Sequence, residues 1–233
     1  MEHLYDTHFH LDLQKNRTAA IREIEEHKIY TIAVTNLPDL YRKESIEIAS
    51  KYIRFALGFH PELLYQYKNQ IPLMWELLSD ARYIGEVGLD FVDVTHKNEQ
   101  LAFFSELIER CRYDKHKIIS IHSRKAVRHV IDIIGDNFRF KPILHWFTGS
   151  ENELSNAIEK GFYFSVNKSM LNSKKFQSML ALIPKERLLF ETDSPFISFS
   201  YSHYETLTKI NQFIKGKKVD VNMWNNFKAI LDK

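Results

Sequence analysis

Cysteine is almost absent from this sequence, which contains Cys111 and no other. One thiol forms no disulfide within the chain and cannot build a zinc site from cysteine ligands. Because Cys111 falls within the helix-like run Leu101 to Tyr113, we expect its thiol to be a small buried apolar group. Disulfides and cysteine-based metal motifs are therefore excluded as the basis of the fold.

The chain also lacks a long apolar run, a signal-like start and a large charge excess. No hydrophobic stretch reaches the roughly 20 residues that cross a bilayer, and the opening Met-Glu-His is not a basic region before an apolar core. The net charge of +2 is far below the basic excess of general nucleic-acid binders. We expect a cytoplasmic protein without a membrane partner, in which any phosphate-binding surface is local.

Glycine and proline are scarce, with seven and six in 233 residues, and no stretch rich in them marks a linker. No low-complexity tract or block of like charge divides the chain either. Apolar residues make up 44% and charged residues 27%, which is typical of a folded globular protein. We expect residues 1–233 to form one domain.

Short apolar runs alternate with amphipathic stretches at helical spacing, which is the pattern of repeated βα units on a parallel sheet. Eight strands are predicted, at Leu4 to Thr7, Thr31 to Thr35, Arg54 to Gly58, Tyr83 to Glu86, Ile118 to Ile121, Pro142 to Leu144, Phe162 to Val166 and Leu188 to Glu191. Helices are predicted near residues 17–27, 39–51, 70–79, 97–113, 124–135, 151–160, 173–182, 203–214 and 221–231.

Eight such units indicate an α/β fold of the (β/α)8 TIM-barrel type rather than a doubly wound sheet. A doubly wound dinucleotide fold has a glycine-rich first turn, whereas the first turn here, Phe9 to Asn16, contains no glycine. In a TIM barrel the C-terminal ends of the strands form one rim that carries the catalytic groups. The residues that end each predicted strand are therefore the candidates for chemistry.

Those strand ends are rich in imidazoles and carboxylates. His8 and His10 alternate along the first strand, so their side chains point to the same side. The later strands end in His60, Glu86, His122, His145 and Asp193. The six remaining histidines, among them His203, fall at a strand start, in helices or in loops.

So many buried imidazoles and carboxylates at one mouth would be costly to desolvate without a cation. Four imidazoles and two carboxylates exceed the needs of one tetrahedral ion and suit two adjacent ions, with Glu86 between them. Nitrogen and oxygen ligands without sulfur fit Zn, Mn or Mg alike. Two ions suit hydrolysis of a phosphodiester, for which Asp193 is the candidate to orient or deprotonate the water.

Six motifs occur in a characteristic order and spacing, at Asp6 to Asp12, Gly58 to Pro61, Gly85 to Asp90, Ile121 to Arg124, His145 to Ser150 and Glu191 to Pro195. Together they resemble the TatD-like family of metal-dependent deoxyribonucleases, a branch of the amidohydrolase superfamily. The resemblance implies a distorted (β/α)8 barrel of the metal-dependent hydrolase type. It also implies a set of metal ligands, namely His8, His10, Glu86, His122, His145 and Asp193.

The same resemblance implies that His60 lies near the scissile phosphate as a catalytic group and that Arg124 helps to bind the DNA backbone. Two features depart from the family pattern. Relatives carry a basic loop after Thr-Asp-Ser-Pro, whereas here Phe196 to Ser200 leads directly to a predicted helix, so part of the substrate rim is missing. Trp146 replaces a smaller residue, and either packs beneath the rim or offers a stacking face to a base.

The predicted function is hydrolysis of DNA phosphodiester bonds, with a preference for single strands or 3′ ends. The short chain and the missing loop are similar to a compact TatD-like branch encoded in anti-phage defence clusters, in which activity would depend on partner proteins. One alternative is a deacylase, for example of aminoacyl-tRNA, because the same ligand set serves attack on a carbonyl carbon. Another alternative is a partner-dependent metal-binding subunit with little activity. The presence of Asp193 and His60 at an open mouth argues against it.

Overall fold

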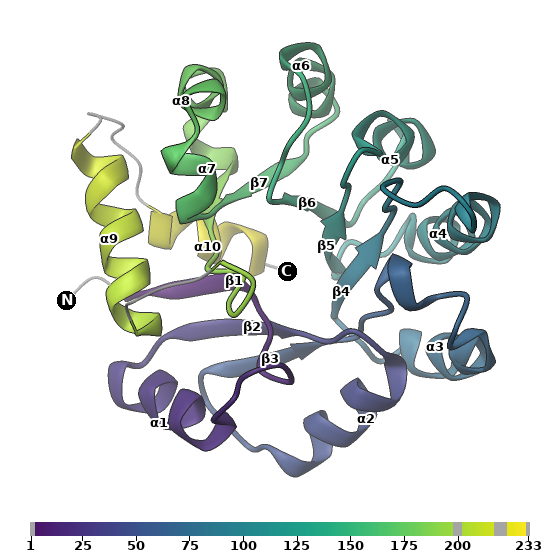
Figure 1. Cartoon of the computed structure of the whole chain (residues 1–233), viewed down its shortest axis with the longest axis horizontal. Coiled ribbons are helices and arrows are strands. Elements are labelled where there is room, and N and C mark those ends of the chain that lie inside the picture. Colours follow the sequence, from purple (N-terminus) through teal and green to yellow (C-terminus); the bar gives the residue numbers. More distant parts are fainter. Residues whose placement is uncertain (1–2, 198–201, 217–222, 232–233) are drawn as a thin grey trace.

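The computed structural model describes residues 3–197, 202–216 and 223–231. In this part of the chain eight parallel strands alternate with helices that surround them (Figure 1). The strands are β1 (Tyr5–Phe9), β2 (Tyr30–Val34), β3 (Ile53–Ala56), β4 (Tyr83–Gly88), β5 (Ile118–His122), β6 (Lys141–His145), β7 (Tyr163–Val166) and β8 (Leu188–Phe190). The predicted TIM barrel is confirmed, and each predicted strand overlaps an observed one.

The strands follow the chain order around the barrel, as a sheet of β1 to β3 and a sheet of β4 to β8. A bridge between Leu57 and Ile84 joins the two sheets at the β3–β4 seam. Between β8 and β1 the barrel closes just beyond the strand ends, because the Asp193 N–H donates to the His8 carbonyl at 3.0 Å. The closure therefore lies at the C-terminal mouth, where it positions predicted site residues.

Gly58 allows β2 and β4 to approach each other across the end of β3. The Thr35 N–H donates to the Gly85 carbonyl at 3.0 Å, and the Glu86 N–H donates to the Thr35 carbonyl at 3.1 Å. A Cβ atom on Gly58 would lie 1.6 Å from the Thr35 oxygen and 2.7 Å from the Glu86 nitrogen. Only glycine fits there, so this crossing holds the main chain of Glu86 in place.

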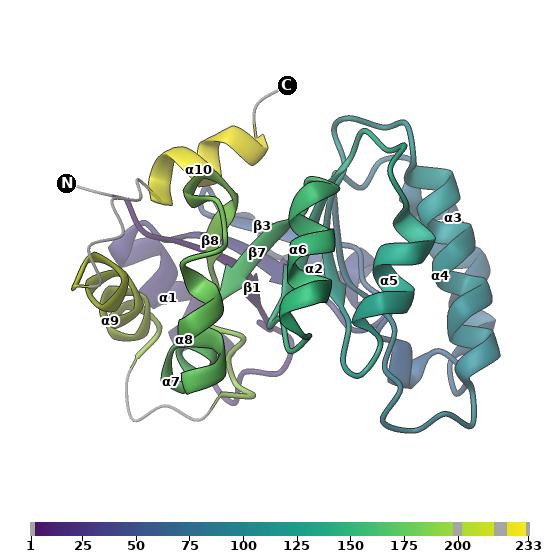
Figure 2. The same cartoon turned by 90° about the horizontal axis from the view of Figure 1, so that it is seen from above.

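The helices cover the outside of the strands (Figure 2). They are α1 (Arg17–His27), α2 (Pro38–Glu47), α3 (Ile71–Leu78), α4 (Lys97–Cys111), α5 (Val127–Ile134), α6 (Glu151–Glu159), α7 (Lys168–Asn172), α8 (Lys174–Leu180), α9 (His203–Gly216) and α10 (Met223–Leu231). Three short 3-10 helices, η1 (Pro61–Leu63), η2 (Lys68–Gln70) and η3 (Lys185–Arg187), complete the described elements.

Local sequence explains where several helices begin. The Asn16 side chain accepts a hydrogen bond from the Ala19 N–H at the start of α1, and Ser150 and Glu153 form a capping box at the start of α6. The predicted helix at 39–51 ends at Glu47, and α7 was not predicted. Residues 198–200, which belong to the segment found in place of the relatives' basic loop, and residues 221–222, which begin the predicted last helix, lie outside the described residues.

The core consists of the strand side chains inside the barrel and those packed between strands and helices. Helix α5 shows the second layer, because Val127, Val130, Ile131 and Ile134 are buried on one face at helical spacing. Cys111 is buried on α4, as predicted. Among the described residues no helix is both long and apolar enough to cross a membrane. The single-domain prediction for residues 1–233 stays a prediction.

Candidate metal centre

The structure brings every predicted site residue to the C-terminal mouth of the barrel. A cavity of about 700 Å³ opens there, and its lining includes His60, Glu86, His122, Arg124, His145 and Asp193. His8 and His10 lie fully buried and contact this lining from β1 and its end. The convergence of strand ends that was predicted from the sequence is therefore observed.

Glu86 lies at the centre, and its two carboxylate oxygens face different histidines. Oε2 is 3.5 Å from His8 Nε2 and 3.3 Å from His10 Nε2. Oε1 is 2.6 Å from His122 Nδ1 and 2.8 Å from His145 Nε2. One carboxylate thus faces four imidazoles, two from β1 and its end and one each from β5 and β6.

Asp193 and His60 complete two groups that can hold a metal ion. Asp193 Oδ1 lies 3.7 Å from His8 Nε2 and 3.5 Å from His10 Nε2. His60 Nε2 lies 3.6 Å from Glu86 Oε1, in a group with His122. Within each group the ligand atoms all lie within 4.8 Å of one another. A third group of the same kind is formed by His8, His145 and Glu191, so the described residues provide three neighbouring ligand groups, one of which contains Glu86.

Each of the four central imidazoles has its second ring nitrogen against another polar group. His8 Nδ1 is 2.7 Å from Ser120 Oγ, and His122 Nε2 is 2.8 Å from Asp90 Oδ2. The corresponding His10 and His145 nitrogens lie 3.8 Å from Asp12 Oδ1 and Glu191 Oε2 respectively. Hydrogen bonds such as those of His8 and His122 fix the orientation of metal-binding histidines and leave the other nitrogen for the ion. The two contacts of 3.8 Å are longer than hydrogen bonds, and His145 Nδ1 has no hydrogen-bond partner among the described residues. The donor set therefore fits divalent cations.

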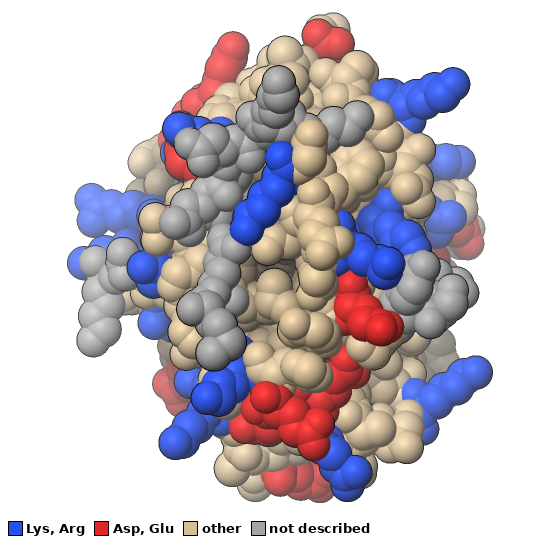
Figure 3. Space-filling view, turned by 90° about the vertical axis from the view of Figure 1, so that its left-hand side faces the viewer, with Lys and Arg blue, Asp and Glu red and all other residues tan. Residues whose placement is uncertain are grey.

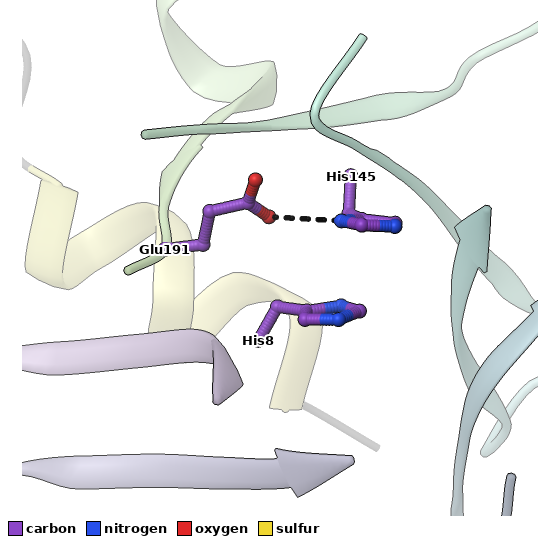
Figure 4. Close-up of side chains that lie close together, drawn as sticks. All are labelled: His8, His145 and Glu191. Carbon is purple, nitrogen blue, oxygen red and sulfur yellow. Dashed lines mark ion pairs between the residues drawn. The ribbon is translucent and has the colours of Figure 1, made fainter. Parts of the chain in front are cut away.

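Glu191 is the most thoroughly held of these outer partners. Its carboxylate accepts hydrogen bonds from the Trp146 N–H at 3.0 Å, from Asn167 Nδ2 at 2.8 Å and from Ser165 Oγ. Figure 4 shows this carboxylate directed at His145, while His8 lies beneath the His145 ring. Glu191 was given no role from the sequence, although it opens a motif that was singled out.

Asp6 and His203 form a second unpredicted contact, which fastens β1 to β8 and α9. Asp6 accepts hydrogen bonds from the His8 N–H at 3.0 Å and from the Thr192 N–H at 3.1 Å. His203 Nε2 lies 2.8 Å from Asp6 Oδ2, and its ring stacks on Phe9 with centroids 4.5 Å apart. The sequence placed His203 away from the strand ends, and no local signal links it to Asp6.

The carboxylates and imidazoles perturb each other strongly. Burial raises the pKa of Glu86, but His60, His145 and His122 outweigh burial and hold that pKa well below its usual value. Burial lowers the pKa of His10, whereas Asp193 and Glu86 raise it to about 9. The His145 pKa is raised well above its usual value because Glu86 and Glu191 outweigh burial. The Glu86 carboxylate is therefore held in its ionised form, as an anionic metal ligand must be.

Two residues at the mouth have left-handed backbone conformations, with φ of 39° at Trp146 and 51° at Asp193. Such conformations are unfavourable for residues other than glycine and often occur at functional sites. Trp146 is half-buried and lines the cavity. Arg124 stands at the rim with 58% of its side chain exposed, and its Nη1 is 4.0 Å from Asp90 Oδ2. Trp146 and Arg124 are therefore available to a ligand in the cavity.

Proteins of similar sequence span most of the chain. A protein of Encephalitozoon cuniculi named as a TATDN1 homologue is 30% identical over 81% of this chain and 69% of its own length. YabD of Bacillus subtilis, named an uncharacterized metal-dependent hydrolase, is 29% identical over 84% and 81%. The 3′-5′ ssDNA/RNA exonuclease TatD of Erwinia tasmaniensis is 24% identical over 78% and 75%.

The fold is also similar to that of a solved structure, YjjV, a TatD homologue from Escherichia coli. The TM-score is 0.83 at 17% identity, with 97% of each chain covered. The family model for TatD-related DNases matches residues 5–231. The predicted resemblance and the prediction of a metal-dependent hydrolase are thereby confirmed. This chain belongs to the TatD-related DNase family.

Proposed function

We propose that this protein is a deoxyribonuclease that hydrolyses phosphodiester bonds with two divalent metal ions. The orientation of Glu86 supports the proposal, since each of its oxygens faces a separate pair of imidazoles. One ion would be held by His8, His10 and Asp193, the other by His122 and His145, with Glu86 shared between them. Zn, Mn and Mg all suit this set of nitrogen and oxygen ligands.

The chain's own side chains then have distinct roles in hydrolysis. A water oxygen forms a bond to phosphorus while the bond between phosphorus and the leaving sugar oxygen breaks. Asp193 accepts the proton from the water, and His60, which lines the cavity, supplies a proton to the leaving oxygen. Arg124 binds a phosphate oxygen from the rim. Divalent ions, when bound, stabilise the negative charge that develops on the phosphate.

The proposed substrate is DNA, bound as a single strand or at a 3′ end. The names of two relatives support this choice. One is named as a deoxyribonuclease TATDN1 homologue, and the other as a 3′-5′ ssDNA/RNA exonuclease. The cavity of about 700 Å³ is large enough for the end of a strand. Trp146 offers a ring to the cavity, on which an unpaired base can stack.

The proposal is tested by hydrolysis of end-labelled single-stranded DNA by metal-stripped protein, with Mg, Mn or Zn added back. We expect metal-dependent cleavage that is lost in Asp193→Asn and retained in Glu76→Gln, because Glu76 is exposed on α3 and does not line the cavity. The pattern of labelled products gives the polarity. Metal bound without cleavage of DNA, together with hydrolysis of aminoacyl-tRNA, would replace the nuclease proposal by the deacylase alternative.

The number of ions is tested separately, by elemental analysis of the purified protein. We expect about two ions per chain in the wild type and fewer in Glu86→Gln, because the amide cannot serve as a shared anionic ligand. The Glu76→Gln protein is the control and should retain the wild-type count. An unchanged count in Glu86→Gln would contradict the assignment of Glu86 as the shared ligand.

We also propose, from the sequence resemblance alone, a cytoplasmic protein that acts with partner proteins in anti-phage defence. The test compares plaque counts on cells that carry the complete gene cluster with wild-type protein or with Asp193→Asn. Equal plaque counts would contradict a defence role for the hydrolase site.

A further inference from the structure

The cavity at the metal centre has two chemically different halves. Phe196, Leu13, Leu37, Leu40 and Leu63 line one half, together with Asp12, Asn36, His60 and Glu62. These residues follow β8, β1, β2 and β3 in turn, which are consecutive around the barrel (Figure 1). The apolar half is therefore one continuous sector of the mouth.

Charge distinguishes the two halves as well. The apolar sector also carries Asp12 and Glu62, whereas Arg124, after β5, is the only lysine or arginine among the described residues that line the cavity. Lys175 Nζ lies 3.4 Å from the carbonyl of Thr148, another lining residue after β6, and adds positive charge on that side. A phosphate group is thus attracted towards β5 and β6 and repelled from the apolar sector.

The face of the molecule that Figure 3 shows carries no large basic surface in addition to this local charge. Blue and red side chains alternate there, and no continuous basic tract crosses the described part of that face. The end of a DNA strand presents one base and one phosphodiester together. The base matches the apolar sector, and the phosphodiester matches the charged centre beside it.

We propose that the apolar sector, Leu13, Leu37, Leu40, Leu63 and Phe196, binds the base and deoxyribose of the terminal nucleotide. Its phosphodiester then lies at Glu86, and the rest of the strand leaves over Arg124 and Thr148. The inference rests on the proposed nuclease function and adds to it the specificity subsite. The five apolar side chains offer no charge to a further phosphate, and His60, which lies beside them, faces Glu86 at 3.6 Å, so the strand ends in this sector and cleavage is exonucleolytic.

The first experiment compares the hydrolysis of three small chromogenic phosphodiesters by the metal-loaded wild-type protein. Two are thymidine 5′-(p-nitrophenyl phosphate) and its 3′ isomer, and the third is methyl p-nitrophenyl phosphate, which has no base. We expect kcat/KM for at least one thymidine ester to exceed that of the methyl ester by roughly tenfold or more, because an apolar pocket discriminates by that order. Equal values for both thymidine isomers and the methyl ester would overturn the subsite.

The second experiment places a charge in the sector. Leu40→Asp introduces an anion beside the base position, in the first turn of α2, where an acidic side chain is compatible with the helix. We expect the ratio of kcat/KM between the thymidine and methyl esters to fall roughly tenfold. Ile46→Asp is the matched control, because Ile46 is 79% exposed on the same helix and does not line the cavity. Leu63→Gln, in η1, tests the same ratio of kcat/KM with a polar side chain from a different element.

A binding measurement without turnover completes the design. Calorimetric titration of the metal-loaded protein with thymidine monophosphate and with deoxyribose 5-phosphate should show tighter binding of the former, and Leu40→Asp should reduce the difference. Equal affinities for the two ligands would overturn the subsite while leaving the nuclease proposal intact. Absence of hydrolysis of all three esters and of DNA would instead overturn the nuclease proposal, and with it the inference.

Discussion

The imidazole rings of His8 and His145 are stacked face to face, with centroids 3.9 Å apart and 12° between their planes. Burial lowers the pKa of His8, and the neighbouring charge on His145 lowers it further. If both stacked rings were in the positively charged imidazolium form, their charges would repel each other at short distance. At least one ring is therefore held neutral, with a lone pair that can bind a metal ion. The pair links β1 to β6 across the mouth.

Glu191→Gln tests the outer contact of this pair. The amide keeps the size of the side chain but removes the negative charge that lies 3.8 Å from His145 Nδ1 and favours the orientation of that ring. We expect metal affinity to fall by a factor of about 10 to 100, measured by competition with a chelator. Glu186→Gln, on an exposed site, is the control. Unchanged affinity in Glu191→Gln would mean that the backbone alone orients His145.

Gly58→Ala tests the crossing of β2 and β4. The added methyl group would overlap the Thr35 carbonyl and approach the Glu86 nitrogen, so the two strands must separate. We expect a loss of about 3 kcal/mol or more in the free energy of unfolding, measured with urea. Gly216→Ala, with nothing within 4 Å of the added carbon, should cost nothing. Equal stability of the two variants would contradict the role of the crossing.

His203→Phe tests the contact between α9 and β1. Phenylalanine preserves the stacking on Phe9 but leaves Asp6 without one of its donors, which should cost about 1 to 3 kcal/mol of stability. The control is His27→Phe, because His27 is exposed and stacks on Tyr204 at the surface. Its effect should stay within about 0.5 kcal/mol. Urea titrations of both variants at one pH decide between these outcomes.

Glu44 should give the stability a pH dependence unlike that of an ordinary carboxylate. Its side chain is 2% exposed and pairs with Arg17 at 2.9 Å, but burial outweighs that pair and raises the Glu44 pKa to about 7. The folded state therefore binds the proton more tightly than the unfolded chain. This stabilisation is complete below about pH 4.5 and is lost as the pH rises through about 7.

The measurement for Glu44 is urea unfolding of wild type and Glu44→Gln between pH 5 and 8. The wild type should lose up to about 1.4 kcal/mol per pH unit relative to the variant across this window, because the neutral amide does not titrate. Parallel pH profiles for the two proteins would show that Glu44 has an ordinary pKa in the fold.

The alternation of strands and helices was readable because buried parallel strands are continuous apolar runs and the helices are amphipathic. The predicted α1 matches the observed Arg17–His27 because Asn16 marks its start. Helix α7 was missed since it spans only Lys168–Asn172, too short for a periodic signal. Ser173 then ends α7 and caps α8, which had been predicted as a helix over 173–182.

The ligand positions could be predicted because barrel topology sends strand ends to one rim, whatever the loops contain. The outer partners could not. Ser120 and Ser165 lie within strands, where a single small polar residue in an apolar run gives no sign of its neighbour. Asp6 and His203 are 197 positions apart in the sequence, so only the closed barrel brings them together.

The hydrogen bonds that hold Glu86 across Gly58 also have a thermodynamic consequence for loading with ions. Since Thr35 holds the main chain of Glu86 from one side and Phe59 donates to the Glu86 carbonyl at 2.9 Å from the other, this backbone is ordered before any ion arrives. The entropy of fixing the central ligand is then part of folding and not of binding. The amide protons of Glu86 and Phe59 should accordingly exchange with deuterium at similarly slow rates with and without metal.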